Sequence, residues 1–386
     1  MTQATDSQRR AAKLIRILAI DGGGVRGIIP AQILVALERK LREITGEANA
    51  HVADFFDLIG GTSTGGLLTC LLLTPDRESR RPRYSAAEAL DLYVQHGGEI
   101  FSSSLYHRLR TAGGLAAEKY PSDALEKVLA AYFQDDWMSD LLKPCMVPAY
   151  DIRRRRAMFF TQHDALKRPP RDFRVRDVVR AATAAPTYFE AANIESRSGV
   201  HYPCIDGAVF ANNPTLCAYA EARTHFGAKA QDLAILSLGT GEEAQSYHHE
   251  VAKDWGAFAW VKPLIDIMMS GVAETVDYEC RLAYEAVGVP QQYLRINMPL
   301  RDLPPGSTAN LDDASEANLN ALREMGMELA ERMDAELSRF AELLVATDQR
   351  KGTTEYESTR AQSNLATLTS GPSPDGVDSP EARGGS

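Results

Sequence analysis

The chain has 386 residues, of which 44% are hydrophobic, so it can bury the core of one large α/β domain or of two smaller ones. Its formal net charge of -10 and its isoelectric point near 5.4 argue against a nucleic-acid polymer as partner, because phosphate binding relies on clustered Lys and Arg. Residues 1–13 are polar and the five cysteines form no C-x-x-C pair, so we expect no secretion signal, no transmembrane helix and a cytoplasmic protein with reduced thiols.

The first half of the chain contains two strand-turn-helix units. Ile15–Ile20 is a short apolar run that ends at a glycine cluster, and Ile29–Leu41 then has the apolar spacing of a helix. The pattern recurs with a buried strand at Phe55–Ile59, a sharp turn at Gly60–Gly66 and an apolar helix at Leu67–Leu73. Two such units close together predict an α/β fold around a mainly parallel sheet.

The remaining elements extend this sheet and cover it. Strands are expected at Cys145–Tyr150, Ala157–Thr161, Tyr202–Ile205, Leu233–Leu238 and Tyr293–Ile296, and helices at Ala86–Gln95, Ser122–Tyr132 and Pro214–His225. Right-handed crossovers would place the helices on both faces of the sheet. Apolar residues three and four apart from Asp313 to Leu344 predict one long amphipathic helix, for which Asp313 and Glu316 make a capping box. We therefore expect one domain over residues 14–350 and a disordered tail over residues 351–386.

A G-x-S-x-G motif occupies Gly61–Gly65 and lies between the second predicted strand and its helix. This is the setting of a nucleophile elbow, in which a sharp turn lifts the serine hydroxyl, here that of Ser63, to the N-terminus of a helix where negative charge is stabilised. The same pattern also arises by chance in glycine-rich turns.

A second glycine-rich turn, Asp21–Gly27, reads DGGGVRG and allows two interpretations. It satisfies the G-x-G-x-x-G pattern of a dinucleotide-binding turn, but the next strand ends in the serine elbow and not in the acidic residue that would hold a ribose. Alternatively, the backbone N-H groups of three successive glycines form an oxyanion hole, with Arg26 adding positive charge or holding the loop.

A serine nucleophile needs a base, and histidine is the usual one. None of the eight histidines except His201 lies next to a predicted strand end or glycine turn. The remaining candidate is Asp206, which follows the apolar strand Tyr202–Ile205 in the tripeptide Asp-Gly-Ala. Since an exposed aspartate has a pKa of about 3.9, partial burial would have to raise the pKa of Asp206 for it to act as a base.

Taken in order, the motifs DGGGVRG, GTSTGG and DGA resemble those of the patatin family of lipid acyl hydrolases. The segments AAPTYF at Ala184–Phe189, ANNP at Ala211–Pro214, LSLGTG at Leu236–Gly241 and DDASEAN at Asp312–Asn318 are also similar to patatin segments, so the resemblance runs from about Ile15 to about Leu344. It implies a three-layer α/β/α sandwich around the sheet. It also assigns a role to each matching residue: Ser63 as nucleophile, Asp206 as base, the oxyanion site at Gly22, Gly23, Gly24 and Arg26, and motif positions at Gly27, Gly61, Gly65, Gly207 and Ala208.

The resemblance implies hydrolysis of glycerophospholipids and related acyl lipids by a phospholipase A type mechanism, with no metal or organic cofactor and with peripheral contact at the membrane surface. Without a secretion signal, the chain looks like an intracellular bacterial member of the family. Some such members are membrane-degrading effectors of antiphage defence that cyclic nucleotides switch on, so that role and a small anionic activator are compatible with the sequence. An acyltransferase on the same dyad and a non-catalytic storage or scaffold protein stay open as alternatives.

Ten Lys and Arg residues against three Asp residues between Arg153 and Arg180 form a local basic surplus in this acidic chain. One hypothesis is that part of this region faces anionic lipid headgroups or an anionic regulator. The alternative is a solvated face whose charges form ion pairs within the protein.

Overall fold

The computed structural model describes residues 14–101, 123–186, 188–242, 246–301, 303–304 and 306–348, except for the side chains of Asp123, Ala257, Phe258, Val261 and Lys262. The expected polar segment, residues 1–13, and the expected tail, residues 351–386, lie outside this range. Along the described part of the chain, we find no helix with the length and apolar character needed to span a bilayer.

Eight strands form one mixed sheet in the order β5-β6-β3-β2-β1-β7-β8, with β4 also paired to β3. The strands are β1 (Ile15–Ile20), β2 (Leu58–Gly61), β3 (Cys145–Asp151), β4 (Arg156–Thr161), β5 (Ala192–Glu195), β6 (His201–Asp206), β7 (Leu233–Leu238) and β8 (Tyr293–Ile296). Strands β3, β2, β1, β7 and β8 run parallel, whereas β4, β5 and β6 pair antiparallel at one side. The carboxyl ends of the parallel strands therefore meet at one edge of the sheet, where ligand sites of such sheets lie.

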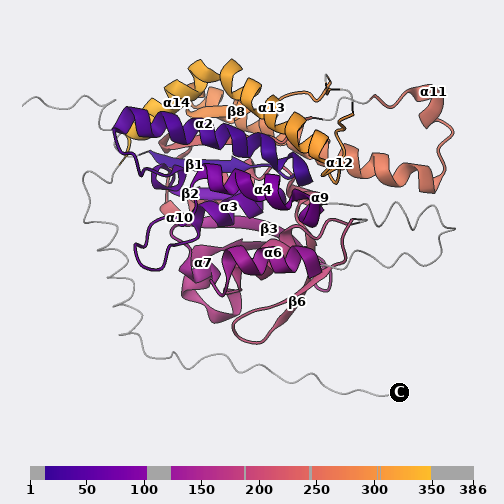
Figure 1. Cartoon of the computed structure of the whole chain (residues 1–386), viewed down its shortest axis with the longest axis horizontal. Coiled ribbons are helices and arrows are strands. Elements are labelled where there is room, and N and C mark those ends of the chain that lie inside the picture. Colours follow the sequence, from indigo (N-terminus) through magenta and orange to yellow (C-terminus); the bar gives the residue numbers. More distant parts are fainter. Residues whose placement is uncertain are drawn as a thin grey trace, which may run out of the picture. The chain divides into compact units, whose positions relative to one another are not determined.

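Helices cover both faces of this sheet (Figure 1). They are α2 (Ile28–Thr45), α3 (Thr64–Leu73), α4 (Ala86–Phe101), α6 (Asp123–Phe133), α7 (Gln162–Lys167), α8 (Val175–Ala182), α9 (Ala208–Ala211), α10 (Thr215–Phe226), α11 (His249–Ala252), α12 (Ala257–Ala286), α13 (Glu316–Arg332) and α14 (Asp334–Ala346). Figure 1 shows α13 and α14 beside α2, although they come from the opposite end of the chain.

Successive residues of the central strands enter two separate hydrophobic cores. On β1, Leu18 belongs to a large core that includes residues of α2, α3, α4 and α8, whereas Ile17 belongs to a smaller core with Ala218 and Ala222 of α10 and Tyr284 of α12. The same alternation separates neighbouring residues of β2, β3 and β7. A sheet whose side chains are buried on both sides is the middle layer of a three-layer α/β/α sandwich, which confirms the predicted fold class.

The second strand begins later than the sequence predicts. Residues Val52–Phe55 form a 3-10 helix, and β2 starts at Leu58 instead of Phe55. The reason lies at Asp57, whose carboxylate accepts hydrogen bonds from the backbone N-H and the guanidinium of Arg16 at 2.8–2.9 Å. Because that carboxylate occupies the Arg16 N-H, the regular parallel pairing with β1 begins only at Leu58.

The prediction of one long helix after Asp313 is wrong. The structure has two helices, α13 and α14, separated at Met333, which leaves the helical conformation at φ -95° and ψ 17°. Both helices contact α2, and the break lets the second one reach it, where Asp334 pairs with Lys40 at 2.5 Å. The helix start also differs, because the cap of α13 is Ser315, whose hydroxyl accepts from the N-H of Asn318, and not Asp313.

Candidate active site

Ser63 lies in the tight turn between β2 and α3, at the carboxyl edge of the sheet. Its backbone has φ 54° and ψ -120°, a conformation that an L residue adopts only under strain. The glycines on either side allow this turn, since a Cβ on Gly61 would overlap the carbonyl of Gly65, and a Cβ on Gly65 would overlap the carbonyl of Ile20. The strained elbow leaves the Ser63 side chain at the N-terminus of α3.

Asp206 is brought to this turn from the antiparallel side of the sheet. It ends β6, where it pairs with Ala149 of β3, and its backbone N-H donates to the carbonyl of Ala184 at 3.0 Å. The Ser63 hydroxyl donates a hydrogen bond to Asp206 Oδ2 at 2.6 Å, and the N-H of Ala208 donates to Oδ1 at 2.8 Å. Two residues that are 143 positions apart in the sequence thus form a buried hydroxyl-carboxylate pair.

Burial raises the pKa of Asp206 from 3.8 to about 7, while the hydrogen bonds from Ser63 and Ala208 act in the opposite direction. The side chain is 1% exposed, so the ionised carboxylate loses nearly all of its hydration. A carboxylate with a pKa near neutrality is a far stronger base than an exposed aspartate. The burial that the sequence interpretation required is present.

The glycine-rich turn lies next to Ser63, and its backbone is held on several sides. The N-H of Gly22 donates to the carbonyl of Asn212 at 3.0 Å, and the carbonyl of Gly22 accepts from the Thr240 hydroxyl at 2.7 Å. Gly24 has φ 57°, and a Cβ there would overlap the carbonyl of Leu311. The backbone of Gly23 and Gly24 faces the same space as Ser63, whereas the N-H of Gly22 already has an acceptor.

A buried ion pair supports the start of this turn, and the sequence analysis missed it. Arg295 of β8 donates to both carboxylate oxygens of Asp21 at 2.5 and 2.9 Å, and also to the hydroxyl of Ser237 on β7 at 2.9 Å. Asp21 directly precedes the glycines, so this bidentate contact ties the turn to β7 and β8. No local spacing in the sequence points to a pair whose members lie 274 positions apart.

Arg26 and the remaining motif residues have structural contacts. The Arg26 guanidinium donates to the carbonyl of Ala309 at 3.4 Å, and its side chain does not line the space in front of Ser63. Gly27 and Gly207 mark close approaches, because a Cβ would overlap the Thr64 hydroxyl at Gly27 and the Pro148 carbonyl at Gly207.

Ser63, Asp206, Gly23 and Gly24 lie on the wall of one pocket, here called the Ser63 pocket. Most of its other lining residues are apolar and come from helices and loops on several sides, among them Ile100, Leu125, Phe189, Val209, Ile265 and Met269. Ser63 is only 8% exposed, so a substrate carbonyl has to enter the pocket to reach its hydroxyl. Apolar walls around one polar pair are suited to a ligand with a long hydrocarbon part.

The other predicted residues lie elsewhere. No histidine of the described residues lines the Ser63 pocket, and His107 is outside them. In the basic region, six arginines form ion pairs with nearby acids: Arg154 with Asp151, Arg168 and Arg171 with Asp164, Arg174 and Arg176 with Asp135, and Arg180 with Glu126 and Glu190. Six of the ten basic side chains of this region are therefore paired within the protein, and a role of the region toward anionic lipids stays a hypothesis.

Comparisons with known proteins place the chain in a family. A family model described as patatin-like phospholipase matches residues 18–219. "Patatin-like protein 2" of Oryza sativa subsp. indica is 32% identical over 371 residues, covering 88% of this chain and 90% of that protein. "Probable inactive patatin-3-Kuras 1" of Solanum tuberosum is 32% identical over 379 residues, covering 91% of this chain and 98% of that protein.

Among solved structures, "Crystal structure of VipD from Legionella pneumophila" aligns with 83% of this chain and 67% of its own, at 10% identity and a TM-score of 0.38, a likeness too low to carry an argument. The family model and the sequence relatives are sufficient to assign the family of the chain. The chain belongs to the patatin-like phospholipase family.

Proposed function

We propose that the chain is a lipid acyl hydrolase of the phospholipase A type, which cleaves the carboxylic ester bonds of glycerophospholipids through Ser63 and Asp206. One observation carries the proposal: the Ser63 hydroxyl donates to Asp206 Oδ2 at 2.6 Å on the wall of an apolar pocket. Membership of the family alone does not decide activity, since one of the relatives bears the word inactive in its name. The geometry of the pair favours an active enzyme.

In the acylation step, Asp206 removes the proton of Ser63 as the hydroxyl oxygen attacks the ester carbonyl carbon. The raised pKa of Asp206 supports this role, because a base with a pKa of about 7 is strong enough to accept the proton and still largely ionised above neutrality. The tetrahedral intermediate then collapses, the ester C-O bond breaks, and the proton passes from Asp206 to the departing lysophospholipid oxygen. Ser63 is left as an acyl ester.

The negative charge on the carbonyl oxygen needs hydrogen-bond donors that are fixed before the reaction. We assign this role to the backbone N-H groups of Gly23 and Gly24, because both glycines line the pocket together with Ser63. Gly22 and Arg26 hold the turn, through Asn212 and Ala309 respectively, so their contribution is to position the donors. Each such donor typically accounts for about 3–4 kcal/mol of transition-state stabilisation.

In deacylation, water is the nucleophile and the Ser63 oxygen is the leaving group, while Asp206 is again the base. Water occupies the place of the departed alcohol, Asp206 removes one of its protons, and the resulting hydroxide attacks the acyl carbonyl. When the Ser63 oxygen leaves, it takes back the proton from Asp206, and a fatty acid is released. The cycle uses only the described side chains and backbone groups, with no cofactor.

The substrate class is tested with vesicles of a diacyl phosphatidylcholine and of its diether analogue, which contains no carboxylic ester. We expect fatty acid and lysophospholipid from the diacyl lipid, no product from the diether, and no product from either with Ser63→Ala. Equal release by wild type and Ser63→Ala from the diacyl vesicles would overturn the proposal. Adding glycerol distinguishes a transferase, since the acyl group on Ser63 would then pass to glycerol and give monoacylglycerol in place of fatty acid.

A further inference from the structure

The first half of α12, together with the preceding segment that contains α11, extends away from the sheet (Figure 1). The second half of α12 packs on α10 and β8 and buries Cys280 and Tyr284. In the first half, Trp260, Leu264, Ile267 and Met268 are 39–50% exposed. Leu264, Ile267 and Met268 follow Trp260 by four, seven and eight residues, which places all four along one side of the helix. These four residues are named the α12 patch here.

The α12 patch is continuous with the Ser63 pocket. Met268 belongs to both, since it is 45% exposed and also lines the pocket, and its neighbours Ile265 and Met269 line the pocket as well. A path along α12 thus leads from the exposed patch to the wall that carries Ser63 without a charged side chain among the residues that form it. An acyl chain that leaves an apolar medium at the patch could enter the pocket without crossing water.

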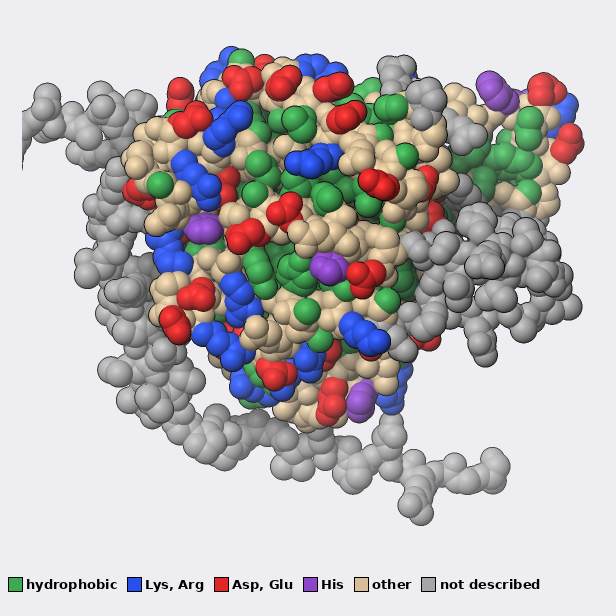
Figure 2. Space-filling view, in the orientation of Figure 1, with side chains coloured by type: hydrophobic (Ala, Val, Ile, Leu, Met, Phe, Trp, Pro, Cys, Tyr) green, Lys and Arg blue, Asp and Glu red, His purple; other side chains and the backbone are tan. Residues whose placement is uncertain are grey.

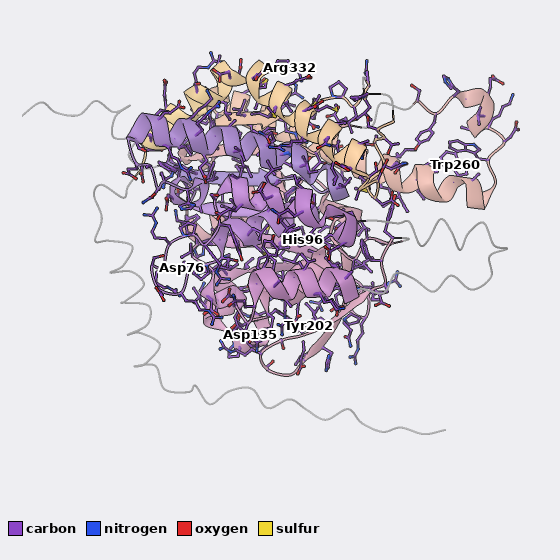
Figure 3. The ribbon with its side chains drawn as sticks, viewed as in Figure 1. Asp76, His96, Asp135, Tyr202, Trp260 and Arg332 are labelled. Carbon is purple, nitrogen blue, oxygen red and sulfur yellow. The ribbon has the colours of Figure 1, made fainter. Side chains whose placement is uncertain are left out.

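The end of this extension carries the residue types that favour a membrane interface. Trp260 packs edge to face on Trp255 with ring centres 5.0 Å apart, and Trp255 packs in the same way on Tyr247 at 5.4 Å. Figure 3 places Trp260 in the extension, and Figure 2 shows hydrophobic side chains along it, with charged residues and histidine at its outer end. Trp and Tyr are enriched at the boundary between lipid headgroups and acyl chains.

We propose that the α12 patch is a docking surface for a lipid bilayer, which places the mouth of the Ser63 pocket against the acyl layer. The inference deepens the proposed function and rests on it for the identity of the occupant. The expected driving force is burial of apolar side chains, because the four side chains of the α12 patch are uncharged and Lys253 near it is paired with Glu250. Docking is therefore expected on zwitterionic phosphatidylcholine and with little dependence on salt, in contrast to an electrostatic anchor.

Binding is measured without hydrolysis by sedimentation of the Ser63→Ala protein with phosphatidylcholine vesicles at low and high salt. In this background, Trp260→Ala with Leu264→Asp is expected to lower the partition coefficient at least about tenfold. Leu282→Asp is the matched control, since Leu282 is 45% exposed on the second half of the same helix and does not line the Ser63 pocket. It is expected to bind like the Ser63→Ala parent.

Three results would overturn the docking surface. The first is an equal partition coefficient for the double variant and its Ser63→Ala parent, and the second is an equal loss of vesicle binding with Leu282→Asp. The third is a parent protein that does not bind vesicles but forms a dimer without lipid, which the double variant abolishes. The last would identify a second copy of the chain as the occupant.

Hydrolysis rates, measured with proteins that retain Ser63, separate this inference from the proposed function. The double variant is expected to lose vesicle hydrolysis about as much as binding, while it keeps the wild-type rate on a water-soluble short-chain ester. If wild type binds vesicles through the patch but releases no fatty acid, the proposed function fails and the docking surface stands. If wild type and the double variant hydrolyse and bind vesicles equally, the docking surface fails and the function stands.

Discussion

A pH series on the wild-type enzyme perturbs the carboxyl group on which the proposed mechanism depends. Asp206 acts as a base only when ionised, and burial raises its pKa to about 7. We therefore expect kcat/KM to rise about tenfold per pH unit below pH 7 and to level off above it, because this parameter follows ionisation of the free enzyme.

The magnitude separates two cases clearly. With a pKa of about 7, the ionised fraction of Asp206 at pH 5 is about one hundredth, so kcat/KM is expected to be about a hundredfold below its plateau. With the ordinary aspartate value of 3.8, more than about nine tenths of the groups would be ionised at pH 5, and the activity there would be almost maximal.

The assay is hydrolysis of a soluble nitrophenyl ester, followed at the wavelength where ionised and neutral nitrophenol absorb equally, with Ser63→Ala as the background at every pH. A soluble ester keeps changes in lipid packing out of the profile. A profile that is flat from pH 5 to 8 would refute the assignment of Asp206 as a base whose pKa is raised by burial.

Three further predictions concern stability. Folding raises the pKa of Asp206 to about 7, so the wild-type protein is expected to lose stability as the pH rises from about 4 to 7. Asn at this position does not titrate, so the free energy of unfolding of Asp206→Asn is expected to rise relative to wild type by up to about 4 kcal/mol over that range. A difference between the two proteins that stays constant with pH in urea unfolding would contradict this. Gly61→Ala is expected to cost at least about 3 kcal/mol, whereas Gly98→Ala, at a helical position with open space around it, is expected to stabilise by about 0.5–1 kcal/mol; similar effects of the two in thermal unfolding would refute the close approach at the elbow. Arg295→Ala leaves Asp21 buried without its bidentate partner and is expected to cost about 3–5 kcal/mol; a loss below 1 kcal/mol in chemical unfolding would show that the pair does not hold the glycine turn.

Local patterns predicted the parallel half of the sheet well. Strands β1, β7 and β8 begin and end at the predicted residues, because each is a short, mostly apolar run that is at least partly buried. The elbow at Ser63 follows from its glycines. The position of Asp206 directly after an apolar strand marks it as a candidate base, but its distance from Ser63 depends on β6 running antiparallel beside β3, which no local pattern contains.

Features that depend on long-range contacts were missed. The helix α12 was not predicted because Pro263 interrupts its first half and because many of its apolar residues face outward, so the usual one-sided pattern is absent. The pair of Asp21 and Arg295 joins the residue after β1 to a residue of β8, and these two strands are brought near each other only through β7. The break at Met333 follows no glycine or proline and reflects the fit of both helices to α2.

The most direct test of the proposed dyad combines covalent labelling with fatty acid release from phosphatidylcholine vesicles for the wild type, Ser63→Ala and Asp206→Asn. We expect that a fluorophosphonate labels the wild type at Ser63 alone, that Ser63→Ala takes no label, and that Asp206→Asn is labelled far more slowly. Fatty acid release is expected to be lost in both variants, although their thermal unfolding stays cooperative. Label on another residue, or lipid release by either folded variant at the wild-type rate, would contradict the assignment of Ser63 and Asp206 as nucleophile and base.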